Sequence, residues 1–206
     1  MYAPLQLVDT RYMTGKLATE ESACLANHFL IAMPNLADPN FAHTVTLLCE
    51  HSAAGAMGLI INRPTEVKLC DLFEHLELEA SENSPREQIV YAGGPVQRDR
   101  GFVIHPPDDN NWDATARISP EVAITTSRDI LAALARGEGP EQSLVALGYA
   151  GWGSGQLEEE LAQNAWLSGP IDSKVIFETD TSRRWYAAAA NMGIDISLLS
   201  SESGHA

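Results

Sequence analysis

Hydrophobic residues in this chain gather in short runs that are separated by polar, glycine-containing or proline-containing segments. Runs of this length that are rich in β-branched and aliphatic side chains predict buried strands rather than helices. The second and third runs are joined by so short a link that they predict an antiparallel hairpin. The predicted strands are His28–Met33, Thr44–Glu50, Met57–Asn62, Ile89–Ala92, Gly101–His105, Val122–Thr126, Ser143–Tyr149 and Val175–Glu178.

A second pattern, with hydrophobic residues three and four positions apart, predicts amphipathic helices. The clearest case is Lys68–Leu78, whose leucines and phenylalanine follow the i, i+3, i+4, i+7 spacing. Another helix is capped by Thr126 or Ser127 and is expected to end at Gly137, since glycine readily adopts the left-handed conformation that terminates helices. Further helices are predicted after Gly155 and over Trp185–Met192.

The segment Ser143–Trp166 is expected to organise the fold, because it reads as a strand, a glycine-rich loop and a helix. The glycines fail the dinucleotide pattern G-x-G-x-x-G, where Glu158 stands in the third position, and no lysine follows them as in a P-loop. Three consecutive glutamates would also repel a phosphate at the start of the helix. Ser154 lacks the flanking glycines of a nucleophile elbow. The segment therefore predicts a tight turn between strand and helix.

Strands dominate the first half of the chain and alternate with helices later, which predicts a single α+β domain rather than a doubly wound parallel sheet. No linker divides the 206 residues into two domains. Residues 18–26 have the composition of a short helix, and a loosely attached arm explains the start of the chain equally well.

Charge and cysteine content limit the functions and the cellular location that we expect for this chain. The chain has 13 basic and 28 acidic side chains, a formal net charge of −15, and this argues against direct nucleic-acid binding. Three cysteines without a CxxC motif indicate reduced thiols, and the N-terminus lacks the apolar core of a signal peptide. No apolar run is long enough to span a bilayer. We therefore expect a cytoplasmic protein that does not bind membranes.

Several stretches together resemble the AlgH/YqgE family of bacterial proteins, from about Leu25 to near the C-terminus. The resemblance rests on the order of these stretches along the chain more than on any single stretch. They are Asn27–Pro34, Asp38–Phe41, Thr44–Val45, Cys49–His51, Gly55–Pro64, Gly93–Val96, Gly148–Trp152 and Gly155–Glu158.

The resemblance implies one α+β domain over residues 25–206, with a strand-rich, barrel-like central sheet surrounded by helices, and an N-terminal extension over residues 1–24. It implies no particular reaction. The name AlgH comes from a link to the regulation of alginate production, which implies a regulator of transcription. Because no helix-turn-helix is visible and the chain is acidic, such a regulator is expected to act indirectly, through a protein or small-molecule partner.

Three turns that follow predicted strands could line one shallow ligand or partner site. Arg63 is the only cation among them and could pair with a carboxylate or phosphate, while Trp152 could provide a stacking face. The alternative is that these residues only meet the backbone demands of turns. The candidate binding residues are Asn62, Arg63, Pro64, Gly93, Gly94, Gly151, Trp152 and Gly153.

Cys49 and His51 are a candidate reactive pair. Two positions apart on a strand, they are expected to share one face about 7 Å apart, with Glu50 pointing the other way. An imidazole there could activate the thiol. The alternative is a small buried cysteine and a hydrogen-bonded histidine at a strand end.

No metal or cofactor is expected, because the histidines are scattered and the Asp108–Asn111 cluster lacks EF-hand spacing. Without a catalytic signature, the chain predicts a non-catalytic binding module, either a monomer or a weak dimer. The alternative is an enzyme with a small-molecule reaction that uses Arg63 and possibly the Cys49–His51 pair.

Overall fold

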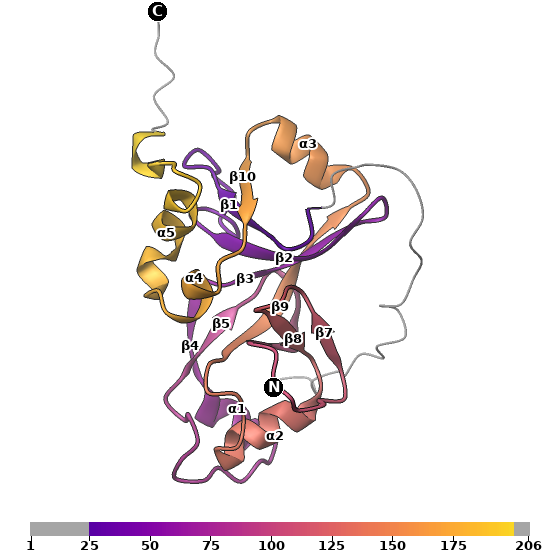
Figure 1. Ribbon diagram of the computed structural model, residues 1–206, viewed down its shortest axis with the longest axis vertical. Helices are drawn as coiled ribbons and strands as arrows, with labels where there is room; N and C mark the ends of the chain where they lie inside the picture. The colour runs from indigo at the N-terminus through magenta and orange to yellow at the C-terminus, as the bar shows by residue number, and fades with distance from the viewer. Residues whose placement is uncertain (1–24, 200–206) are drawn as a thin grey trace, which may run out of the picture.

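A curled β-sheet occupies the centre of the protein, whose residues 25–199 are described by a computed structural model (Figure 1). Its strands follow the order β10-β1-β2-β3-β9-β6-β8-β7, and β5 pairs with both β4 and β9. The β5–β9 pair is parallel and the other pairs are antiparallel. The strands are β1 (His28–Ala32), β2 (Val45–Ser52), β3 (Gly55–Ile60), β4 (Pro64–Lys68), β5 (Ile89–Ala92), β6 (Val96–His105), β7 (Thr115–Arg117), β8 (Ala123–Thr125), β9 (Leu144–Gly153) and β10 (Trp166–Pro170).

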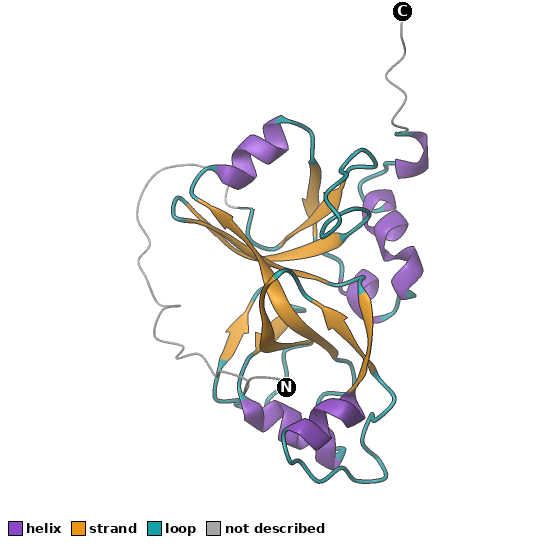
Figure 2. Ribbon diagram, turned by 180° about the vertical axis from the view of Figure 1, so that it is seen from behind, coloured by secondary structure: helices purple, strands orange, loops and turns teal. Residues whose placement is uncertain are grey.

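The helices lie around the sheet. Helices α1 and α2 lie together at one end of the molecule, α3 lies at the opposite end, and α4 and α5 lie along one side (Figures 1 and 2). This arrangement confirms the single α+β domain with a barrel-like centre, which here is a half-barrel. The helices are α1 (Leu69–His75), α2 (Arg128–Arg136), α3 (Gln156–Ala162), α4 (Ser173–Phe177) and α5 (Arg184–Ala190), with 3₁₀ turns at Thr181–Arg183 and Ile196–Leu198.

The inner face of the sheet holds the largest hydrophobic core, which we call the inner core. Alternate residues of β1, β2 and β3 enter it, together with β6, β8 and β9. Helices α4 and α5 cover it through Val175, Ile176 and Trp185, all of which are buried. The indole of Trp185 also donates a hydrogen bond to the Ala32 carbonyl, 2.9 Å away, and so fixes α5 on β1.

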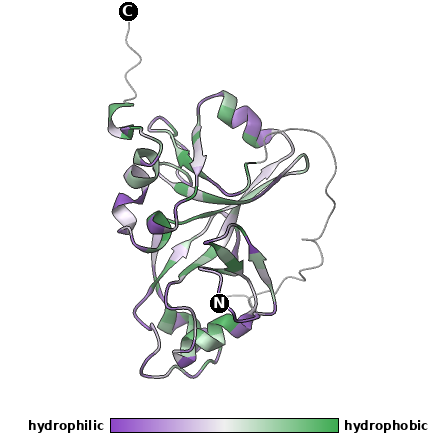
Figure 3. Ribbon diagram, viewed as in Figure 1, coloured by the Kyte–Doolittle hydropathy of each residue, from purple (hydrophilic) through white to green (hydrophobic). Residues whose placement is uncertain are grey.

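Two smaller cores lie on the outer face of the sheet. One is formed where α1 and α2 pack on Val90, Val103 and Val145. The other is formed where α3 packs on β1, β2 and β9, and it contains Trp152 and Trp166. In Figure 3 many of the central strand segments and much of α1 and α2 are hydrophobic, whereas α3 is mostly hydrophilic.

Strand β9 contributes to all three cores because Gly148 resets its side-chain alternation. Ala146 points into the inner core and Val145 into the α1–α2 core, as a regular strand requires. At Gly148 the backbone is left-handed, with φ of 74°, a conformation that glycine adopts without strain. Beyond it, Tyr149 packs on the inner core and Ala150 enters the α3 core.

Most of the predicted strands and helices are confirmed, with two corrections. Val175–Glu178 is not a strand but lies largely in α4, because the Asp172 carboxylate accepts a hydrogen bond from the Lys174 amide at 2.9 Å and starts a helix. The expected glycine loop is mostly strand, since β9 continues to Gly153, where it pairs with Gly55. The expected extension, residues 1–24, lies outside the described residues.

Three strands, β4, β7 and β10, are absent from the prediction. Each is short, and none has an uninterrupted hydrophobic run. Strands β10 and β7 are the two edge strands of the strand order. Within the described residues β10 pairs only with β1, and β7 pairs only with β8. Edge strands need little apolar sequence, and this is why the pattern did not reveal them.

Candidate functional site

Asn62 and Arg63 bind backbone rather than facing an open site. The Asn62 side chain accepts a hydrogen bond from the Val45 amide at 2.8 Å and donates one to the His43 carbonyl at 2.9 Å. The Arg63 guanidinium donates to the carbonyls of Pro39 and Asn40, at 2.7 and 2.9 Å. Both side chains thus hold the loop between β1 and β2 against the start of β4.

The backbone of Gly93 and Gly94 is packed between neighbouring strands. The Gly93 amide donates to the Leu147 carbonyl and its own carbonyl accepts from the Ile60 amide, each at 2.8 Å. A Cβ atom at Gly94 would lie 2.1 Å from the carbonyl carbon of Tyr149. These glycines are buried because the chains approach so closely, and no side chain fits in their place.

Trp152 lies in an aromatic cluster beneath α3. Its ring stacks on Phe41 with 6.1 Å between centroids and meets the edge of Trp166 at 6.0 Å. Both indoles donate to one carboxylate oxygen of Glu160, at 2.9 Å from Trp152 and 2.7 Å from Trp166. With only 6% of its surface exposed, Trp152 offers no free stacking face. Its neighbours Gly151 and Gly153 are exposed.

The three predicted turns do not meet at one place. Arg63 lies beside the glycine pair, since its carbonyl accepts from the Ala92 amide at 2.8 Å. Gly153 instead pairs with Gly55 at the beginning of β3, whereas Gly93 bonds to Ile60 at its end. Five residues of strand separate the two positions by about 17 Å.

Cys49 and His51 lie on opposite faces of the sheet, so the expectation of a shared face is wrong. The register of β2 against β3 shifts between Leu48 and Glu50, which indicates a β-bulge that breaks the alternation. Cys49 enters the inner core. His51 instead lies 2.8 Å from the Glu158 carboxylate of α3.

The chemistry of Cys49 also argues against a nucleophile. Burial raises the pKa of its thiol far above the ordinary value, with a further contribution from the charge of Glu50. Its Sγ donates to the Leu47 carbonyl at 3.3 Å. A thiol that stays protonated in an apolar core is a structural residue.

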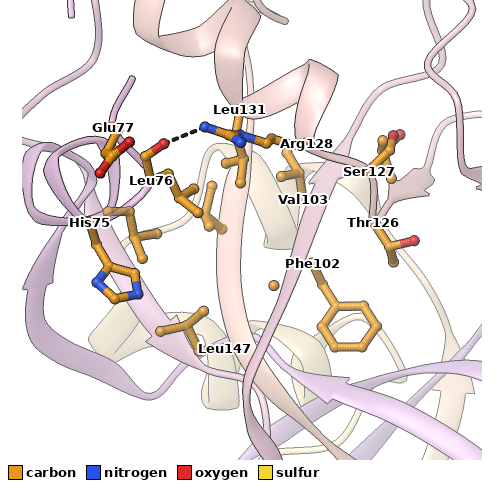
Figure 4. A pocket seen from close by; sticks show the side chains of 14 residues that line it. His75, Leu76, Glu77, Phe102, Val103, Thr126, Ser127, Arg128, Leu131 and Leu147 are labelled. Atoms are coloured by element: carbon orange, nitrogen blue, oxygen red, sulfur yellow. Dashed lines mark hydrogen bonds between the residues drawn. The ribbon is translucent and has the colours of Figure 1, made fainter. Parts of the chain in front are cut away.

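A pocket lies on the outer face of the sheet, where α1 and α2 leave a gap above β6 and β9. It has a volume of about 310 Å³. Its floor is made by five residues whose side chains end in methyl groups (Figure 4). They are Leu72 from α1, Leu131 from α2, Val103 from β6, and Val145 and Leu147 from β9.

The mouth of this pocket is polar. His75 and Glu77 lie at the end of α1, and Thr126, Ser127 and Arg128 lie at the start of α2 (Figure 4). The Arg128 guanidinium donates to the carbonyl of Leu76 and so joins the two helix ends across the opening. An apolar floor below a few polar groups is the usual form of a small-molecule site.

Sequence reasoning missed this pocket although it predicted both helices that form it. The signal lay in their apolar faces, which are wide enough to cover the sheet. Whether two helices close over a sheet or leave a gap depends on how they approach it, which the spacing of hydrophobic residues does not determine.

Within residues 25–199 no helix is both long and apolar enough to cross a membrane. No three His, Cys, Asp or Glu side chains in the same range are placed to hold a metal ion.

Comparison with known proteins shows where this fold has been seen before. The solution structure of the AlgH protein from Pseudomonas aeruginosa superimposes with a TM-score of 0.73, is 47% identical, and covers 92% of this chain and 100% of that one. A crystal structure of a protein from Corynebacterium diphtheriae has a TM-score of 0.68 at 18% identity, covering 90% of this chain and 95% of that one, and shows the fold alone.

Proteins that are similar in sequence belong to the same group as the AlgH protein. A UPF0301 protein of Methylococcus capsulatus is 55% identical over 185 residues, which cover 90% of this chain and 98% of that protein. A UPF0301 protein of Nitrosococcus oceani is 56% identical over 180 residues, which cover 87% of this chain and 96% of that protein. Residues 29–197 match the family described as AlgH-like. The chain therefore belongs to the AlgH-like family.

Proposed function

We propose that the protein is a non-catalytic binding module whose small-molecule site is the pocket beneath α1 and α2. The observation that carries the proposal is the floor of five methyl-bearing residues beneath a polar mouth. A volume of about 310 Å³ lies at the small end of ligand sites, so the ligand is a small molecule with an apolar body. Its polar end remains at the mouth, beside Arg128 and Glu77.

The same site supports regulation through a partner better than it supports catalysis. Its floor offers no nucleophile, acid or base, and the groups that could serve as such, His75, Glu77 and Ser127, lie at the mouth, away from the apolar body of a bound molecule. Any effect on transcription then runs through the bound molecule or through a protein that recognises the α1–α2 end. The proposal keeps the cytoplasmic location expected from the sequence, which rests on its three cysteines and their spacing.

Methyl NMR spectroscopy tests the site directly. With 1-hexanol as the probe, we expect the methyl resonances of the five floor residues to shift together and to saturate. Methyl groups of Leu30 and Leu48, in the core beneath α3, provide the reference that must not move. Comparing hexanol with hexanoate and hexylamine then identifies the charge that the mouth prefers. Floor methyl groups that stay unchanged at every concentration would refute the proposal.

A filling variant provides the control. Leu147→Trp places a larger ring in the pocket from its half-buried position and should abolish the shifts. Ile89→Trp adds the same ring at a position that is 42% exposed and outside the pocket, and it should bind hexanol as wild type does. Native mass spectrometry of the three proteins would also reveal a co-purified ligand, which should be missing only from Leu147→Trp.

A further inference from the structure

Arg100 is a half-buried cation of β6 on the inner face of the sheet. Its guanidinium carbon lies 5.0 Å from the centre of the Phe102 ring and 5.8 Å from that of Tyr149. Contacts of this kind favour a cation on the ring face. A ring face supplies no hydrogen-bond acceptor of the usual kind to the N–H groups, which lie in the guanidinium plane.

The Nε–H group of Arg100 is unsatisfied. Its Nε atom is buried and has no hydrogen-bond partner, and the side chain makes no hydrogen bond or ion pair with any residue from 25 to 199. Arg184, which is more deeply buried, donates to the carbonyls of Ile61 and Thr179. A buried donor without a partner is costly, so its occurrence calls for an explanation.

Two side chains from other strands act on the charge of Arg100. Burial lowers the pKa of Arg100, while electrostatic interactions with Tyr149 on β9, the strand next to β6, and with Glu50 on β2 oppose that shift. Arginine nevertheless remains a cation at neutral pH. Glu50 is exposed and forms no ion pair with Arg100 in this arrangement.

The surface beside Arg100 is open because position 151 has no side chain. Gly151 is exposed, and a Cβ atom there would lie 3.4 Å from Cε2 of Tyr149. It pairs with Met57, which in turn pairs with Glu50, so one row of residues crosses the sheet at this point. The edge of the Tyr149 ring is therefore left uncovered next to a cation.

We propose that Arg100, Tyr149 and Gly151 form a second binding site, which takes a small carboxylate with a flat apolar body. The guanidinium fork matches the two oxygens of a carboxylate and gives Arg100 the acceptors that it lacks. The flat body covers the Tyr149 ring in the space above Gly151. A carboxylate fits better than a phosphate, because a single negative charge is less strongly opposed by Glu50 and by the net charge of −15.

The test follows the Nε–H resonance of Arg100 by NMR, with benzoate and inorganic phosphate as probes. The resonance is identified by its loss in Arg100→Lys. We expect benzoate to shift it saturably downfield, as a new hydrogen bond requires, while phosphate at equal concentration does not. No shift with benzoate, or a larger shift with phosphate, would overturn the proposal.

Two variants separate this site from general anion binding. Gly151→Leu retains Arg100 but covers the Tyr149 ring, and should weaken benzoate binding at least tenfold. Arg98→Lys changes an exposed cation on the same strand and should leave binding within twofold of wild type. Equal losses in both variants would mean that benzoate only responds to surface charge, which contradicts the proposal.

Glu50 provides a further control, because a change of its side-chain conformation could bring its carboxylate into an ion pair with Arg100 in place of a ligand. In Glu50→Gln we expect the Nε–H resonance to stay where it is without probe, and benzoate to bind more tightly. If the resonance moved upfield without probe, Glu50 would already be its acceptor, and the site would be an internal ion pair. Neither result depends on the pocket beneath α1 and α2.

Discussion

Single residues of the expected site are used to join segments of backbone. Asn62 and Arg63 bind three carbonyl groups of the loop between β1 and β2 and the amide of Val45, the first residue of β2, at 2.7 to 2.9 Å. In the same way, the Glu160 carboxylate holds the indoles of Trp152 and Trp166. The sequence shows that polar residues stand near turns, but the segments they bond to are distant in the chain.

Cys49 permits a test at the same scale, through the pH dependence of stability. Its pKa is raised from 9.0 by burial, so below about pH 9 the thiol is protonated in both folded and unfolded chains and has no effect on the slope. Above pH 9 only the unfolded chain releases the proton. The free energy of unfolding should then fall by about 1.4 kcal/mol per pH unit relative to Cys49→Ala.

Urea denaturation of the two proteins between pH 7 and pH 10.5 provides the measurement. Titration of lysines and tyrosines affects both proteins and cancels in the difference. Parallel curves would show that the Cys49 thiol ionises as easily in the folded protein as in the unfolded one, and would reopen its candidacy as a nucleophile.

At the scale of elements, two glycines with the same backbone conformation allow a matched comparison. Gly148 and Gly155 both have φ of 74°, but a Cβ at Gly148 would lie 2.6 Å from the Gly94 carbonyl oxygen, whereas nothing lies within 4 Å of one at Gly155. Gly155→Ala should cost about 1–2 kcal/mol, for the left-handed backbone alone. Gly148→Ala should cost about 1–3 kcal/mol more, because the clash forces β9 away from its neighbours.

Thermal and urea unfolding of both variants would measure this difference. Equal destabilisation would mean that the reset of the β9 alternation does not depend on close packing against Gly94. The α3 helix, which begins after Gly155, supplies a local readout through the fluorescence of Trp152 and Trp166.

The elements that the sequence predicted well are those with a continuous apolar pattern. Helices α1 and α2, and most of the strands that form the inner core, have one, and the predicted positions agree with the structure. The glycine-rich end of β9 was read as a loop because glycine disfavours strands, yet it pairs with the small residues that begin β3. Such pairing depends on a partner about a hundred positions away. The separation of Cys49 from His51 depends instead on a β-bulge in the β2–β3 hairpin, which the spacing of hydrophobic residues does not reveal.

The whole molecule is acidic, and this leads to a prediction about nucleic acids. With a net charge of −15, a long-range field repels DNA, and none of the helices within residues 25–199 is basic enough to overcome it. We expect no shift of a DNA fragment in an electrophoretic assay, even at low salt, where non-specific binding is strongest. Binding that weakens steeply as salt rises would instead establish direct contact with phosphates and would contradict indirect regulation.

The position of β9 has a consequence for how the chain folds during its synthesis. Strands β1 to β3 and strands β6 to β8 are made early, but they meet only through β9, which ends at Gly153. Until the ribosome has released that segment, the two halves of the sheet keep open edges. The two halves of the sheet can therefore join only after about three quarters of the chain has been translated, and β10 completes the edge beside β1 later still, so we expect the nascent protein to depend most on chaperones during that interval.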